Sequence, residues 1–186
     1  STYATGKVTG STYIGGLVGI SHEGYIMNSY AIGDVLGGMS SIVGGLVGIS
    51  ASQITNTYAT GNVTGSGYVG GLIGQMAENV EENLNSFAFN AQININNHES
   101  TLHSYIGKVI GHSNYPNFSN IYALNSMILN ITNPSDKPIF YGANGTDISM
   151  EDAQKQQTYV ALGWDFNQIW KIGQNGYPTL QTTEEI

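Results

Sequence analysis

The residue pattern closest to a catalytic motif lies at positions 98–103, which read His-Glu-Ser-Thr-Leu-His. Zinc peptidases use His-Glu-x-x-His on a helix, because two histidines four residues apart face the same metal ion. Here the two histidines are five residues apart, so they would not share a helical face. The chain also has no cysteine to supply a thiolate ligand. We therefore expect a polar loop at this position and no metal site.

Pairs of carboxylates are the second candidate for chemistry, because glycoside cleavage needs an acid and a base that face one groove. The first 77 residues contain only Glu23 and Asp34. Glu81, Glu82 and Glu99 could converge on one groove if the segments that carry them are loops inserted into a regular scaffold. A polysaccharide-acting enzyme therefore stays open as an alternative, while our main expectation is a protein without catalytic residues.

A glycine-rich stretch at residues 65–70 reads Gly-Ser-Gly-Tyr-Val-Gly and satisfies the dinucleotide pattern Gly-x-Gly-x-x-Gly. That pattern binds a cofactor only where it follows a strand and opens a helix, with an acidic residue about 20 positions further on. No such context is present, and the glycines belong to a repeat described below. We expect no cofactor.

Composition narrows the classes of partner. Thirteen acidic residues, five lysines and no arginine give a net charge of -8. Nucleic acids and anionic membrane surfaces need basic groups and are excluded as partners. No apolar run approaches the length of about 18 residues that spans a bilayer. The absence of cysteine rules out disulfides and leaves the compartment open.

Two short units recur along the chain and predict its architecture. The first reads Ile-Gly-Gly-Leu-Val-Gly at residues 14–19, with close copies at 43–48 and 69–74 and a degenerate one at 106–111. The second, Asn-Ser/Thr-Tyr/Phe-Ala, occupies residues 28–31, 56–59 and 85–88, and Asn-Ile-Tyr-Ala follows at 120–123. With Tyr3, the aromatic positions are 3, 30, 58, 87 and 122, a period of 27 to 29 residues that widens to 35. The chain begins in mid-repeat, so we expect it to be part of a longer protein.

These segments are short, rich in Val, Ile, Tyr and Thr, and bounded by Gly, Ser and Asn, which predicts strands and turns. Repeats too short to enclose a core bury their apolar residues against neighbouring repeats. We predict an all-β fold, a right-handed parallel β-helix or solenoid of roughly four to five coils, spaced about 4.8 Å apart. Each coil would hold two or three strands. Gly44, Gly45 and Gly48 would allow a bend or a close approach of sheets. Leu46 and Val47 would point to opposite faces of the strand, and a narrow coil favours Leu46 as the one that faces the core.

The chain divides into three parts of one continuous domain. Residues 1–77 hold 18 of the 25 glycines and no proline, and form the regular repeats. Residues 78–146 are degenerate repeats with insertions at 78–83 and 94–101. Residues 147–186 form a cap that opens with a short helix, for which Ser149 is the N-cap and Asp152 lies in the first turn. We expect Trp164, Phe166 and Trp170 in this cap to cover the last coil, because an open strand edge invites further pairing.

With both units in view, the chain resembles the GLUG-motif repeats of bacterial surface proteins, which are named for a Gly-Leu-apolar-Gly core. The residues that carry the resemblance are Gly16, Leu17 and Gly19, then Gly45, Leu46 and Gly48, then Gly71, Leu72 and Gly74. Lys108 and Val109 replace Gly-Leu in the fourth copy.

Such repeats occur in large secreted adhesin-like proteins and in non-catalytic regions of bacterial immunoglobulin A peptidases. The resemblance implies a non-enzymatic, secreted or cell-surface module of a bacterium that serves as an adhesin segment or rigid spacer. Its expected partners are host glycans or extracellular proteins and the neighbouring repeats of the same parent chain. The alternatives are a polysaccharide-acting β-helix or the non-catalytic part of a secreted immunoglobulin A peptidase.

Overall fold

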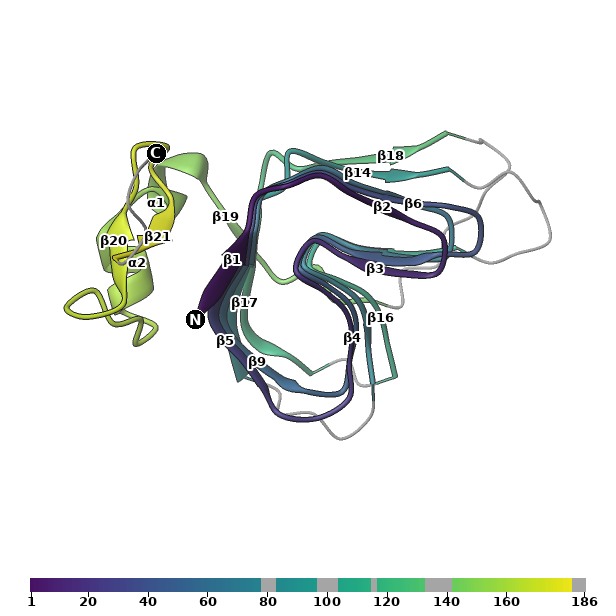
Figure 1. Ribbon diagram of the computed structural model, residues 1–186. Coiled ribbons are helices and arrows are strands. Elements are labelled where there is room, and N and C mark those ends of the chain that lie inside the picture. The colour runs from purple at the N-terminus through teal and green to yellow at the C-terminus, as the bar shows by residue number, and fades with distance from the viewer. Residues whose placement is uncertain (78–82, 97–103, 115–116, 133–141, 182–186) are drawn as a thin grey trace.

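The computed structural model describes residues 1–77, 83–96, 104–114, 117–132 and 142–181. In these ranges the chain winds into stacked coils whose strands form four parallel sheets (Figure 1). Sheet A contains β1 (Thr2–Ala4), β5 (Tyr25–Ala31), β9 (Gln53–Ala59), β13 (Asn83–Ala88), β17 (Ser119–Leu124) and β19 (Thr146–Ile148). Sheet B contains β2 (Val8–Gly10), β6 (Val35–Gly37), β10 (Val63–Gly65), β14 (Gln92–Ile95) and β18 (Ile128–Ile131).

The other two sheets complete each coil. Sheet C contains β3 (Tyr13–Gly15), β7 (Ile42–Gly44), β11 (Tyr68–Gly70) and β15 (Tyr105–Gly107). Sheet D contains β4 (Val18–Ser21), β8 (Val47–Ser50), β12 (Ile73–Met76) and β16 (Ile110–Ser113). The order A, B, C, D therefore repeats as coil 1 (β1–β4), coil 2 (β5–β8), coil 3 (β9–β12) and coil 4 (β13–β16). Strands β17 and β18 begin a fifth coil, and β19, which pairs with β17 in sheet A, begins a sixth.

Equivalent residues of successive repeats stack directly on one another. Tyr30 pairs with Tyr58 in sheet A, and Val43 pairs with Val69 in sheet C. The predicted parallel solenoid is confirmed, and in Figure 1 the chain runs clockwise from β1 to β4 as the coils recede from the viewer, the sense of a right-handed coil. Each coil holds four strands instead of the expected two or three, because a coil turns a corner after as few as three residues.

The Gly-Gly-Leu segment makes a sharp turn between sheets C and D, and the turn points into the coil toward sheet A (Figure 1). A Cβ atom on Gly45 would overlap the carbonyl oxygen of Gly71 and lie 2.8 Å from the Cβ of Ala59. Gly16 meets Ala31 in the same way, and Gly71 meets Ala88. The two repeated units therefore depend on each other: the alanine after each aromatic residue is small because the glycine turn contacts it.

The last glycine of the unit has a second role, since it lets sheets C and D lie against each other. A Cβ on Gly48 would lie 2.5 Å from the carbonyl oxygen of Gly19 and 2.8 Å from the nitrogen of Ile14. Leu46 and Val47 are both fully buried, so the favoured placement of Leu46 in the core is confirmed, whereas the expectation that only one of the two faces inward is wrong. The two adjacent side chains can both be buried because the turn projects into the interior of the coil, so hydrophobic core lies on both sides of it.

In sheet A, strands β5, β9, β13 and β17 each contain an asparagine whose backbone is in the left-handed conformation, and the strand bends at that residue. The φ angles are 51° at Asn28, 53° at Asn56, 45° at Asn85 and 52° at Asn120. Asparagine enters this region more readily than other residues with a Cβ, because its short polar side chain can hydrogen-bond locally. The Asn56 amide donates to the Asn28 side-chain oxygen one coil away, at 3.3 Å. The repeated asparagine is thus explained by backbone geometry, a reason that the sequence pattern alone did not reveal.

The C-terminal segment contains α1 (Met150–Ala153), α2 (Gln156–Val160) and an antiparallel hairpin of β20 (Trp170–Ile172) and β21 (Pro178–Leu180). The predicted N-cap is confirmed, because the Ser149 hydroxyl accepts a hydrogen bond from the Asp152 nitrogen at 3.0 Å. We call residues 149–181 the tail. Figure 1 shows the tail beside sheet A, along the flank of the solenoid.

The prediction that the tail covers the last coil is wrong, because its tryptophans contact coils 2 to 4 from the side. The last coil is instead continued by residues 142–148. The nitrogens of Val109 and Ile110 both donate to the oxygen of Ala143, and β19 pairs with β17. The predicted insertions at 78–83 and 94–101 are also corrected in part, since Asn83 belongs to β13 and Asn94 and Ile95 belong to β14.

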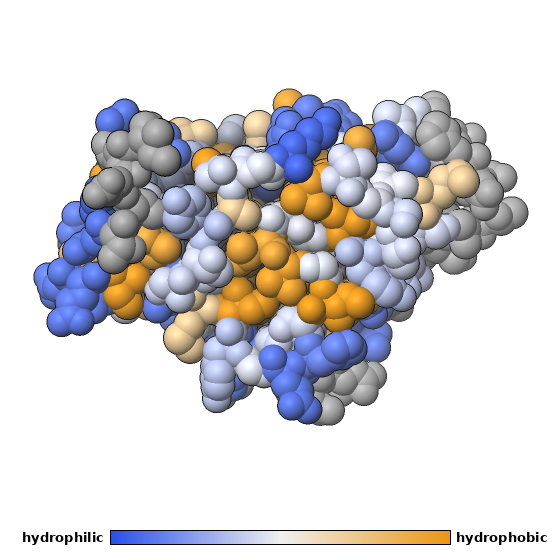
Figure 2. Space-filling model, in the orientation of Figure 1, coloured by the Kyte–Doolittle hydropathy of each residue, from blue (hydrophilic) through white to orange (hydrophobic). Residues whose placement is uncertain are grey.

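The opposite end of the stack is formed by coil 1. Figure 2 shows this end toward the viewer, with hydrophobic residues gathered at its centre. Val8, Leu17 and Val18 of this coil are only half-buried, whereas Val63, Leu72 and Ile73 at the equivalent positions of coil 3 are fully buried. The apolar interior is therefore accessible at this end.

Candidate functional site

A ladder of aromatic rings stands on the outer face of sheet A. Tyr3 stacks on Tyr30 with ring centroids 5.3 Å apart, and Tyr30 stacks on Tyr58 at 4.9 Å with planes only 6° apart. Phe87, which pairs with Tyr58 in the sheet, stacks in turn on Tyr122 at 5.0 Å. The ladder follows from in-register pairing, since an identical position in every repeat must stack on itself.

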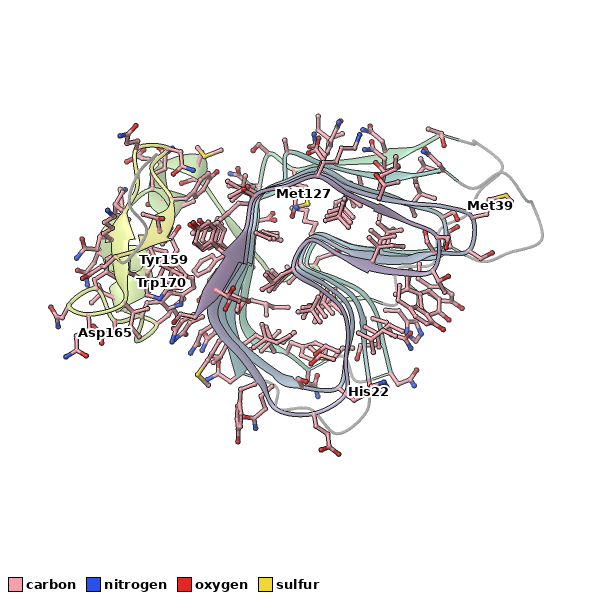
Figure 3. All side chains as sticks on the ribbon, viewed as in Figure 1. His22, Met39, Met127, Tyr159, Asp165 and Trp170 are labelled. Carbon is pink, nitrogen blue, oxygen red and sulfur yellow. The ribbon has the colours of Figure 1, made fainter. Side chains whose placement is uncertain are left out.

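The tail packs its own aromatic side chains onto this ladder. Trp170 lies 6.2 Å from Tyr30 and 6.4 Å from Tyr58, measured between ring centroids. Tyr159 and Trp164 lie 5.0 Å and 5.7 Å from Phe87. Figure 3 shows Tyr159 and Trp170 on the side of the tail that faces sheet A. These contacts bury Trp170 and Tyr159 completely.

Hydrogen bonds fasten the tail to the solenoid. The Trp164 indole nitrogen donates to the main-chain oxygen of Asn85 at 3.0 Å, and the Tyr58 hydroxyl donates to the oxygen of Pro178 at 2.6 Å. The hydroxyls of Tyr30 and Thr179 are 3.1 Å apart. A buried Tyr or Trp needs such a partner for its polar atom. The recurring Tyr30 and Tyr58 are therefore structural, and the Tyr58 hydroxyl is bound by the tail.

A groove opens where the β20–β21 turn leaves the ladder. Its volume is about 460 Å³. Its walls are Tyr30, Ile32 and Tyr58 of the solenoid and Gly173, Gln174, Asn175 and Thr179 of the tail. We call this space the ladder groove. Beside Tyr58, on the coil 4 side, Phe89 and Tyr177 stack at 4.8 Å.

None of these wall residues carries a charged side chain. Burial raises the pKa of the Tyr30 hydroxyl, although its hydrogen bond to Thr179 acts in the opposite direction. Burial also raises the pKa of Tyr58 far above its ordinary value. Both hydroxyls are therefore protonated at neutral pH, so the wall offers neutral hydrogen-bonding groups and aromatic ring edges.

The residues predicted to form the cap do come together. Trp164 lies 4.6 Å from Trp170, and Phe166 packs on Tyr159 at 6.0 Å. Sequence reasoning missed Tyr159, Phe89 and Tyr177, which complete the same cluster. Phe89 had a signal, because a large aromatic residue stands where the earlier repeats have Ile32 and Thr60, and its ring stacks on Tyr177 of the tail.

The other candidates for chemistry do not form a site in the described residues. Glu81, Glu82, Glu99, His98 and His103 lie outside the described ranges. The Asp34 carboxylate accepts a hydrogen bond from the Asn62 nitrogen at 2.8 Å, which gives it a structural role, and Glu23 lies in a different turn of the coil.

Neither a cofactor fingerprint nor a metal cluster appears in the ranges that the structure covers. The glycines of residues 65–70 end β10 and β11, so no helix begins there. No three His, Asp or Glu side chains are grouped as metal ligands within those ranges. Among the described helices, none is long and apolar enough to cross a membrane.

The family comparison matches a stretch that includes β7, the glycine turn, β8 and β9. Residues 39–64 fit the model described as "The GLUG motif". The chain carries the GLUG motif. In this structure the motif is one sheet C strand, the turn toward sheet A, and the next strands of sheets D and A. The copies at Gly16-Leu17 and Gly71-Leu72 occupy the same place in the neighbouring coils, as the pairing of β3, β7 and β11 shows.

Two similar proteins are much longer than this chain. A "Putative Gly-rich membrane protein" of Evansella cellulosilytica is 34% identical over 157 residues, which is 82% of this chain and 13% of that protein. The crystal structure of a putative immunoglobulin A1 protease from Bacteroides ovatus has a TM-score of 0.70 and 28% identity, and the match covers 98% of this chain and 57% of that one. The GLUG solenoid and its tail therefore recur together in a solved structure.

Proposed function

We propose that this GLUG chain is a non-enzymatic module of a bacterial cell-surface or secreted protein and acts as an adhesin segment. The observation that carries the proposal is the interlock of the tail with the aromatic ladder, which holds a solvent-facing groove on the side of a rigid stack. Binding groups held on a rigid scaffold lose little conformational entropy when a ligand binds.

The similar proteins support the location. One is named a membrane protein and the other an immunoglobulin A1 protease. Both names fit a protein that acts outside the cytoplasm. The apolar end of coil 1 supports a further proposal, that neighbouring repeats of the same parent chain are partners of this module, because stacking buries such a face.

The experiment is binding of the purified chain to arrays of host glycans and of extracellular proteins. We expect retention on members of at least one array. The control is the same chain after thermal unfolding, which removes the coils and the groove. If the chain binds to neither array, the adhesin role is rejected and the remaining role is that of a rigid spacer.

The immunoglobulin A1 protease neighbour favours one second candidate, the non-catalytic part of a secreted immunoglobulin A peptidase. Under this proposal the chain binds immunoglobulin A without cleaving it. Immobilised immunoglobulin A tests for binding, and electrophoresis after incubation tests for cleavage. Turnover of immunoglobulin A, or of a panel of neutral and acidic polysaccharides, would overturn the non-enzymatic assignment.

A further inference from the structure

We propose that the ladder groove binds one unit of a neutral saccharide. This inference rests on the proposed adhesin function and names the class of ligand for it. The volume of about 460 Å³ lies within the range of ligand pockets, and the walls combine apolar surface with a few polar groups, as such pockets do.

The apolar part of the wall is Ile32 with the ring edges of Tyr30 and Tyr58. Tyr30 is stacked between Tyr3 and Tyr58, so both of its faces are occupied and its edge points into the groove. The edge of an aromatic ring carries positive partial charge. It therefore favours the hydroxyl oxygens of a sugar, while Ile32 contacts the apolar C–H surface of the sugar ring.

The polar part of the wall comes from the tail. Gln174 and Asn175 are exposed, and each side-chain amide can donate and accept hydrogen bonds. The Asn175 side-chain oxygen accepts from the Tyr177 nitrogen at 3.1 Å, which orients its amide nitrogen as a donor. The hydroxyl pair of Tyr30 and Thr179 adds a further group that can both donate and accept. Sugar hydroxyls require this mixture of donors and acceptors.

Charge selects a neutral sugar over an acidic one. None of the groove residues carries an ammonium or guanidinium group that could pair with a carboxylate, sulfate or phosphate. The chain as a whole has a net charge of -8, which repels anions. Uronic acids, sialic acids and phosphorylated sugars are therefore expected to bind poorly at this groove.

The walls are held in place before a ligand arrives. The Tyr58 hydroxyl is tied to Pro178 and the Tyr30 hydroxyl to Thr179, so the hairpin and the ladder are fixed relative to each other. Preorganisation of this kind reduces the entropic cost of binding. A neutral sugar benefits from that reduction, because it has no charged group to add an ionic contact.

The test uses an array of neutral oligosaccharides beside acidic ones, with solution titration of any sugar that binds. We expect binding to neutral sugars, and a loss of at least tenfold in affinity in the double variant Gln174→Ala/Asn175→Ala. Gln168→Ala is the matched control, because Gln168 is an exposed glutamine of the same tail outside the groove, and it should bind as the unmodified chain does. Ile32→Trp, which fills the groove from the solenoid side, should also abolish binding, with thermal unfolding as the check on its fold.

The outcomes separate this inference from the proposed function. Neutral-sugar binding that survives both groove changes would overturn the inference while leaving an adhesin that binds elsewhere. Retention on acidic sugars alone, or on proteins alone, would likewise overturn the inference and keep the adhesin role. Silence on every array would overturn both.

Discussion

The indole nitrogen of Trp164 donates a hydrogen bond to the main-chain oxygen of Asn85 at 3.0 Å, although the two residues are 79 positions apart. Asn85 is one of the left-handed asparagines that bend the sheet A strands. The bond therefore connects the tail to a feature that recurs in coils 2 to 4 and in β17. It explains how a segment without the repeat becomes part of the solenoid's flank.

Replacing Trp164 by Ala should lower the free energy of unfolding by about 3 to 5 kcal/mol, because it empties a buried aromatic site and breaks this bond. Trp164→Phe keeps most of the packing and should cost less. Urea denaturation measures both changes. Val160→Ala, at an exposed position of α2, is the control and should be nearly neutral. A nearly neutral Trp164→Ala would show that the tail does not stabilise the coils.

Leu46 tests the core of the GLUG turn. Leu46→Ala should cost about 2 to 5 kcal/mol, since the side chain is fully buried and its removal leaves a cavity. Leu36→Ala, at a half-buried outward position on sheet B, should cost clearly less. Chemical denaturation of the two variants side by side gives the comparison, and equal losses would contradict the assignment of Leu46 to the core.

Gly45 tests the contact between the turn and sheet A. Gly45→Ala places a Cβ atom against the Gly71 oxygen and the Ala59 methyl group, so we expect a loss of about 1 to 3 kcal/mol or more. Gly6→Ala introduces the same methyl group where no atom lies within 4 Å, and it should be neutral. Thermal unfolding distinguishes the pair. If the two variants melt together, the close approach of turn and sheet is not present in solution.

Asn56 tests the left-handed bend. Asn56→Ala forces a residue with an ordinary Cβ to hold a φ of 53°, and it also breaks the bond to Asn28. We expect a loss of roughly 1 to 2 kcal/mol from the backbone alone. Asn56→Gly should recover part of it, because glycine adopts positive φ readily. Equal stability of the Ala and Gly variants would show that φ at this position is not the reason for asparagine.

Buried tyrosines should make the protein sensitive to alkaline pH. Burial raises the pKa of Tyr58 and Tyr159 above the ordinary value of 10.0. The unfolded chain therefore loses these protons first, so stability is constant below pH 10.0 and falls as the pH rises further. The expected loss is about 1.4 kcal/mol per pH unit for each tyrosine.

Tyr58→Phe is the test of that slope. It removes the hydroxyl that donates to Pro178 and should cost roughly 0.5 to 1.5 kcal/mol at neutral pH. Above pH 10.0 the difference from the unmodified protein should shrink, because one titrating group is gone. Denaturation midpoints measured from pH 7 to 11 give both quantities, and parallel curves would refute the role of Tyr58.

Much of the fold follows from the sequence because each copy of the repeated units forms the same strands and turns in its coil. A fixed period with Gly-Gly-Leu-Val-Gly and Asn-Ser-Tyr-Ala places like residues in register, and parallel stacking is the arrangement that buries all copies at once. The parallel solenoid, the buried Leu46 and the Ser149 N-cap could therefore be predicted. The number of strands per coil could not be predicted, since a strand of three residues is too short to show a recognisable alternation of apolar and polar residues.

The contact between the two repeated units was also outside the reach of sequence patterns. Gly45 and Ala59 are 14 residues apart and meet only because the turn folds inward toward sheet A of the next coil. The sequence pattern gave a local reason for the glycines, a bend or a close approach of sheets, and none for the alanine. The shared reason appears only when both are seen at one point in the cross-section.

The sequence by itself determined the stacked parallel coils, the motif that spaces them and the aromatic residue repeated in each. The tertiary structure alone decided where the tail lies and that a neutral groove opens beside the ladder. The physical reason is sequence separation. The register of the coils follows from residues that recur within each repeat, whereas Trp164 contacts Asn85, and Thr179 contacts Tyr30, across 79 and 149 positions of the chain.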